Sequence, residues 1–87
     1  MNAKKIKLTG VVIPVDWDED GNAMAVALST AAENVILRAA RVLQKDLLGI
    51  IQKEVEISGI LYTNGSNRTI SVDKYIFKNP EENRITN

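Results

Sequence analysis

The 87-residue sequence contains no cysteine and no histidine. Without cysteine the chain has no disulfide bond, no thiolate nucleophile and no cysteine-ligated metal cluster. Without histidine it lacks the commonest general base and the commonest ligand of transition metals. No nucleophile with a partner base stands out, nor do paired carboxylates at a catalytic spacing. We therefore expect a protein without enzymatic activity and without a cofactor.

The sequence also has no excess charge of either sign. Lysine and arginine number 11, aspartate and glutamate number 11, and the formal net charge is zero. No long-range field therefore attracts nucleic acid, an anionic membrane or a charged substrate. Zero net charge also removes the repulsion between copies of the chain, which favours self-association.

Long hydrophobic runs are missing as well. The apolar run over 11–15 is too short and too far from Met1 to be a signal peptide, and no segment approaches the roughly 20 apolar residues of a membrane span. We expect a cytoplasmic, bacterial protein with no membrane partner. Its length suits one small domain, predicted to cover 1–78, followed by a flexible polar tail over 79–87.

Alternation of polar and apolar residues is the main structural signal. It predicts four strands, over 5–17, 23–29, 54–61 and 68–77. We expect Gly10 at a bend of the first strand and Pro14 at an edge or a bulge. Two segments rich in Asp, Asn and Gly, over 16–22 and 64–67, predict hairpin turns.

The same alternation assigns faces to the strands. The side chains expected to face the core are Met24, Val26 and Leu28 in the second strand, Val55, Ile57, Gly59 and Leu61 in the next, and Ile70, Val72 and Ile76 in the last. The opposite face of the second strand carries Ala23, Ala25, Ala27 and Ser29.

The segment over 30–52 supports two interpretations. Apolar residues at helical spacing would form a single long helix, with one stripe made of Val35, Ala39, Leu43, Leu47 and Ile51. Alternatively, 31–34 is a turn, 35–41 a third strand and 43–51 a short helix. We favour the second interpretation.

Three runs carry a family resemblance. Residues 47–59, 69–75 and 7–12 are similar to small bacterial OB-fold proteins of uncharacterised function, in which a helix leads through Lys-x-Val into one strand and the partner strand reads Ile-x-Val. OB here denotes the oligonucleotide- and oligosaccharide-binding fold. The resemblance implies an all-β fold with one short helix, a five-stranded antiparallel OB-type Greek-key barrel of order β-β-β-α-β-β. It implies no particular ligand.

Alternate carboxylates mark the first turn. Asp16, Asp18 and Asp20, followed by Gly21, match the opening half of a calcium-binding loop. The twelfth position of such a loop holds a bidentate glutamate, whereas this sequence has Ala27. We therefore expect an acidic hairpin turn, with a metal site as the minor alternative.

OB barrels that bind single strands present aromatic side chains on the outer face of strands two and three. Here that face has no aromatic residue, and its small apolar side chains predict a protein contact face made of Ala23, Ala25, Ala27, Ile36 and Ala40. We predict a non-catalytic interaction module that binds a protein partner or a copy of itself. The alternative is weak binding of single-stranded nucleic acid through Trp17, Arg38, Arg41, Tyr62 and Arg68.

Overall fold

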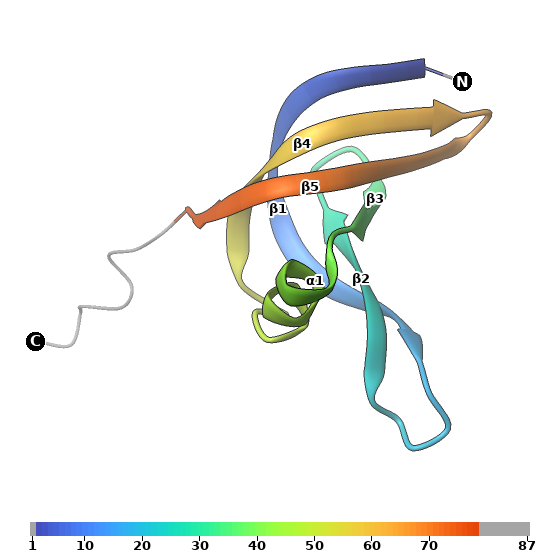
Figure 1. The fold of residues 1–87 in the computed structure, drawn as a ribbon, viewed down its shortest axis with the longest axis vertical. Coiled ribbons are helices and arrows are strands. Elements are labelled where there is room, and N and C mark those ends of the chain that lie inside the picture. Colours follow the sequence, from blue (N-terminus) through green and yellow to red (C-terminus); the bar gives the residue numbers. More distant parts are fainter. Residues whose placement is uncertain (1, 79–87) are drawn as a thin grey trace, which may run out of the picture.

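The computed structural model describes residues 2–78, in which five strands and one short helix follow one another in the order that the sequence predicts. In chain order the elements are β1 (Asn2–Trp17), β2 (Ala23–Ser29), β3 (Asn34–Arg38), α1 (Arg41–Leu48), β4 (Glu54–Asn64) and β5 (Asn67–Phe77) (Figure 1). The predicted tail over 79–87 lies outside the described residues. Within the described part, no helix is long and apolar enough to cross a membrane.

The five strands form one sheet that closes into a ring. The strand order is β1-β2-β3-β5-β4, and β4 pairs with β1 to complete the ring. Four of the strand pairs are antiparallel, but β3 and β5 run parallel. The expectation of a purely antiparallel sheet is therefore wrong for this pair. Because α1 and β4 lie between them in the chain, the direction reverses twice before β5 returns beside β3.

The long first strand belongs to both halves of the ring. Its first part pairs with β4 and its last part with β2, and the change of partner occurs at Gly10 and Val11. A side chain at Gly10 would collide with the carbonyl oxygen of Ser29, only 2.4 Å from an ideal Cβ. β1 curves strongly through this region (Figure 1). The predicted bulge is also present, because the pairing with β2 shifts register between Pro14 and Asp16.

Beyond this bulge the β1–β2 hairpin leaves the ring and forms a projecting arm (Figure 1). We call residues 16–24 the hairpin arm. Val26 and Leu28 are fully buried as predicted, but Met24, predicted to face the core, is 56% exposed. No other strand of the ring packs against the arm. Polar and apolar residues still alternate there, but Met24 has no core to pack into.

The segment over 30–52 is a strand and a helix, so the single long helix is excluded. β3 ends at Arg38, three residues earlier than predicted, and α1 covers Arg41–Leu48 where 43–51 was predicted. Ala40 is the N-cap of α1, and no side chain caps the helix at this end. Since no Ser, Thr, Asp or Asn precedes the helix, the sequence gives no signal for its start.

A bulge in β5 overturns another predicted side-chain position. The β4–β5 register shifts between Ser58 and Gly59, so that Gly59 pairs with Val72 and Ser58 with Lys74, leaving Asp73 as the extra residue. Ile70 and Val72 are buried as predicted, but beyond the bulge the faces exchange. Ile76, expected in the core, is 55% exposed, and Tyr75 packs against the core instead.

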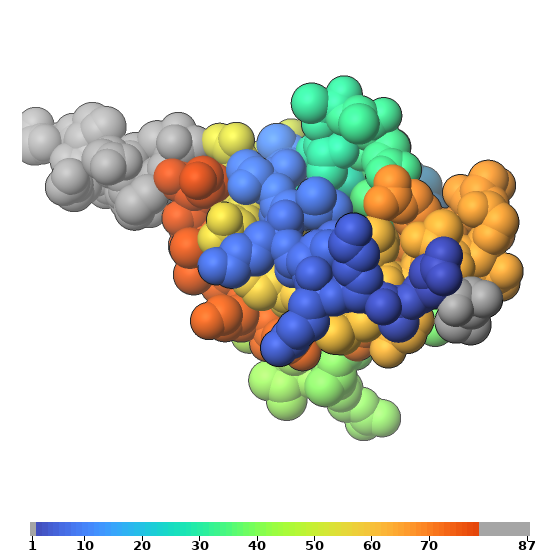
Figure 2. Space-filling view, turned by 90° about the horizontal axis from the view of Figure 1, so that it is seen from above, coloured from blue at the N-terminus to red at the C-terminus, as the bar shows by residue number. Residues whose placement is uncertain are grey.

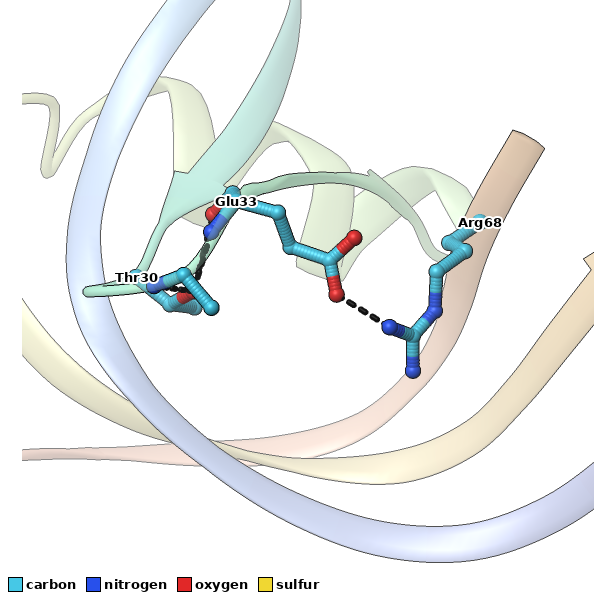
Figure 3. A network of polar contacts seen from close by, with 4 residues as sticks. Thr30, Glu33 and Arg68 are labelled. Atoms are coloured by element: carbon cyan, nitrogen blue, oxygen red, sulfur yellow. Dashed lines mark hydrogen bonds and ion pairs between the residues drawn. The ribbon is translucent and has the colours of Figure 1, made fainter. Parts of the chain in front are cut away.

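The two ends of the ring are closed in different ways. At one end α1 inserts Leu47, its only fully buried residue, among buried side chains of the strands. At the other end, Glu33 from the β2–β3 turn and Arg68 from the start of β5 form an ion pair that links the neighbouring strands β3 and β5 (Figure 3). The turn itself is held by the Thr30 hydroxyl, which accepts hydrogen bonds from the backbone N–H groups of Ala32 and Glu33.

Candidate ligand-binding groove

The outer face of β3, β5 and β4 carries an open hollow of about 420 Å³. Strand register creates it, because Arg38 lies beside Ser71 and Tyr62 lies beside Thr69. These four residues line the hollow. Its walls therefore present one guanidinium group, one phenol ring and two small hydroxyl groups.

A second hollow, of about 630 Å³, lies between α1 and the outer face of β2 and β3. It is lined by Ala25, Ile36, Leu37, Arg38, Ala39, Arg41, Gln44 and Lys45. Arg38 lines both hollows, so they adjoin at that side chain. We call the two hollows together the groove.

The groove is positively charged and contains no acidic side chain. Arg38, Arg41 and Lys45 are exposed, and within residues 2–78 none of them forms an ion pair. Arg41 lies in the first turn of α1, where the helix dipole also contributes positive charge and where no acidic residue is present. The uncapped helix end and the three cations therefore all favour an anionic ligand.

One aromatic side chain is available in the groove for stacking. Tyr62 is 39% exposed, and its neighbours across the sheet are small, since Thr69 pairs with it directly. A ring that stands on the surface above short side chains can accept a nucleobase or another flat group against its face. The groove therefore suits a ligand that has both negative charges, for the cations beside α1, and a flat group, for the ring of Tyr62.

The chain offers no relative from which a ligand could be transferred. No protein-family model, no curated protein and no solved structure matches it. The function of the groove therefore has to be argued from its own chemistry.

Three of the five residues predicted to contact nucleic acid come together in the groove, namely Arg38, Arg41 and Tyr62. The other two lie elsewhere. Trp17 is on the hairpin arm, 54% exposed. Arg68 is held by Glu33 at the end of the ring, and its Nε atom is buried without a hydrogen-bond partner.

Sequence reasoning missed four further polar residues of the groove, namely Gln44, Lys45, Thr69 and Ser71. The spacing of Arg41 and Lys45 could have indicated two of the cations, since residues four apart share a helix face. The parallel pairing that brings Ser71 beside Arg38 leaves no local signal in the sequence.

The predicted alanine face does not form one exposed surface. Ala27 is fully buried, between Ile13 on β1 and Ile36 on β3. Ala40 lies beyond the end of β3 as the N-cap of α1, and Ala23 belongs to the hairpin arm. Only Ala25 and Ile36 of this set line the groove.

Of the three carboxylates considered for calcium, Asp18 holds the turn of the hairpin arm. Asp18 accepts hydrogen bonds from the backbone N–H groups of Asp20 and Asn22, each at 2.9 Å. Its hydrogen bond from the backbone of Asn22 is the largest cause of a pKa below the ordinary 3.8. Within residues 2–78, no three acidic, histidine or cysteine side chains are grouped so as to hold a metal ion.

Another basic hollow lies on the face formed by β1, β4 and β5. Figure 2 shows this side of the molecule, with β1 in blue against β4 in yellow to orange. The hollow, about 490 Å³, is lined by Lys5, Lys7 and Lys74, but also by Asp73. A smaller hollow that shares Lys7 and Lys74 adds Glu56 and Tyr75. Because this face includes two carboxylates among its lysines, it suits an anionic ligand less well than the groove does.

Proposed function

We propose that this protein is a non-catalytic binding module of the OB type that binds single-stranded nucleic acid in the groove. The observation that carries the proposal is the position of Arg38, which joins a cationic hollow to a hollow containing Tyr62. A single strand supplies both matching groups, phosphates for the cations and a base for the ring.

The architecture supports this assignment. Five strands in a closed ring, with the helix between the third and fourth strands, agree with the OB type suggested by the sequence. Proteins of that type bind oligonucleotides over strands two and three and the adjoining loops. The groove lies over β3 and reaches β2 through Ala25 and β5 through Ser71.

The binding should be weak and should not depend on base sequence. Three cations can neutralise about three phosphates, and one stacked base contributes roughly 1–3 kcal/mol. No buried donor or acceptor in the groove is arranged to read the edge of a base. We expect a dissociation constant of about 100 μM or weaker, at the weak end of non-specific binding.

A titration with a mixed-sequence single strand at low salt tests the proposal, followed by amide chemical shifts. Shifts should concentrate on β3, the start of α1 and Tyr62. Replacing Arg38 with Gln should weaken binding about tenfold in low salt, because one of three phosphate contacts is lost.

Lys74→Gln is the matched control. It removes the same charge from the other hollow, where Lys74 is exposed and does not line the groove, and should leave the affinity unchanged. Equal losses for Arg38→Gln and Lys74→Gln, or shifts centred on Lys5 and Lys7, would overturn the proposal.

A further inference from the structure

The hairpin arm carries unpartnered apolar side chains beside a concentration of negative charge. Trp17 and Met24 are among the most exposed large hydrophobic residues, at 54% and 56%. The arm also has exposed carboxylates, Asp16 at the end of β1 and Asp18, Glu19 and Asp20 in the turn. No lysine or arginine occurs in the arm, so nothing within it offsets this charge.

The groove has the opposite composition. Its cations are Arg38, Arg41 and Lys45, and the apolar lining of the same hollow is formed by Ala25, Ile36, Leu37 and Ala39. An acidic hairpin with two large apolar side chains is complementary to such a surface in charge and in polarity. The chain thus contains both halves of a contact.

We propose that the hairpin arm of one copy docks into the groove of a second copy. The contact would cover Trp17 and Met24 and would bring the acidic turn against Arg38 and Arg41. The inference rests on the proposed function only in that both use the groove, for which the second copy and nucleic acid then compete.

The hairpin arm cannot dock into the groove of its own chain. The arm is a direct continuation of β1 and β2, and Ala25, which lines the groove, pairs with Asp16 at the base of the arm. A hairpin this short cannot turn back onto the sheet from which it projects. Because arm and groove adjoin, two copies related by a twofold axis can exchange arms, and this gives a closed dimer with two equal contacts.

The affinity of this dimer should be modest and should fall with salt. Exposed ion pairs contribute little each, typically about 0–1 kcal/mol, and they are screened at physiological ionic strength. Zero net charge leaves no overall repulsion to oppose the contact. We expect reversible dimers that dissociate on dilution.

Sedimentation velocity over a hundredfold range of concentration tests the inference with two charge-reversed variants. Glu19→Lys with Asp20→Lys reverses the arm and keeps Asp18, whose carboxylate holds the turn. Arg38→Glu with Arg41→Glu reverses the groove. Each variant alone should be monomeric at concentrations where the wild type is dimeric.

An equimolar mixture of the two variants should restore the dimer. The reversed arm then faces the reversed groove, and the original arm faces the original groove, so both contacts are attractive again. Glu56→Lys with Asp73→Lys is the control, because it changes net charge as much as the arm variant but lies outside both surfaces. It should dimerise like the wild type.

A wild type that stays monomeric throughout, a control that dissociates like the arm variant, or a mixture that stays monomeric would each overturn the inference. The single-strand titration separates this result from the proposed function. The arm variant keeps the whole groove, so it should bind a single strand at least as tightly as the wild type. A wild type that binds a single strand but stays monomeric would reject the dimer alone, whereas a wild type that dimerises but does not bind a single strand would reject the proposed function alone.

Discussion

At the scale of single residues, Gly59 is the glycine with the least space for a side chain. An ideal Cβ at this position would lie 2.1 Å from the carbonyl oxygen of Ser71. The neighbour is backbone of the paired strand, so no side-chain rotation can relieve the collision. Position 59 is also where the β4–β5 register shifts, which makes the glycine part of the bulge that sets the faces of β5.

We expect Gly59→Ala to lower the free energy of unfolding by about 1–3 kcal/mol, because β4 and β5 must separate to admit the methyl group. Chemical denaturation of the variant and the wild type measures the difference. Gly49→Ala is the control. Gly49 has a φ of −84° and its nearest contact from an added Cβ is 3.4 Å, so Ala should be tolerated there. A Gly59→Ala protein as stable as the wild type would show that the sheet yields at this point.

Predictions of core residues from the sequence succeeded where a strand has the ring beside it, although Ala27, predicted on the outer face, is also buried there. Val26, Ile57 and Ile70 are buried as alternation indicates. The prediction was wrong for Met24 and Ile76, which lie beyond a bulge or beyond the ring. Alternation reports which residues share a face, but it does not report where an extra residue exchanges the faces or where the opposing wall ends.

At the scale of elements, α1 is held mainly by one side chain. Leu47 is its only fully buried residue, with Leu43 and Leu48 partly buried against the same core. An eight-residue helix is too short to persist alone in water. Packing of α1 over the end of the ring therefore determines whether the helical wall of the groove exists.

Leu47→Ala should cost about 2–5 kcal/mol, a large part of the stability of a domain this small, because it leaves a cavity beneath the helix. Thermal unfolding followed by circular dichroism gives the loss. Val42→Ala on the same helix is the control, since Val42 is 75% exposed and its removal should change stability little. Equal effects of the two substitutions would mean that α1 does not close the ring through Leu47.

The number, order and type of the elements were predictable, whereas the groove was predictable only in part. Strand alternation and the turns rich in Asp, Asn and Gly are local signals, so β2 matches its predicted limits. The start of α1 has no capping residue to mark it. The parallel pairing of β3 with β5 is a property of the closed sheet, and it is this pairing that joins Arg38 to the hollow of Tyr62.

At the scale of the whole molecule, the zero net charge conceals an uneven distribution. The groove holds Arg38, Arg41 and Lys45 without a carboxylate, while the hairpin arm holds carboxylates without a cation. The amino-acid composition gives only the sum of the charges on these two surfaces, and that sum suggests that no charged partner is favoured. The fold separates them, so an anionic ligand meets a local positive potential although the molecule as a whole exerts no long-range attraction.

This separation fixes how single-strand binding should respond to salt. Each phosphate neutralised on a single strand contributes about −0.7 to the slope of log affinity against log salt concentration, so three groove cations should give a slope of about −2. Affinities measured by amide shifts at several salt concentrations provide the slope, and Arg38→Gln should reduce it by about one third. A slope near zero would mean that phosphates are not the ligand. A slope of about −4 or steeper would require roughly six contacts, more than the groove has, and would add Lys5, Lys7 and Lys74 of the other basic hollow to the binding surface.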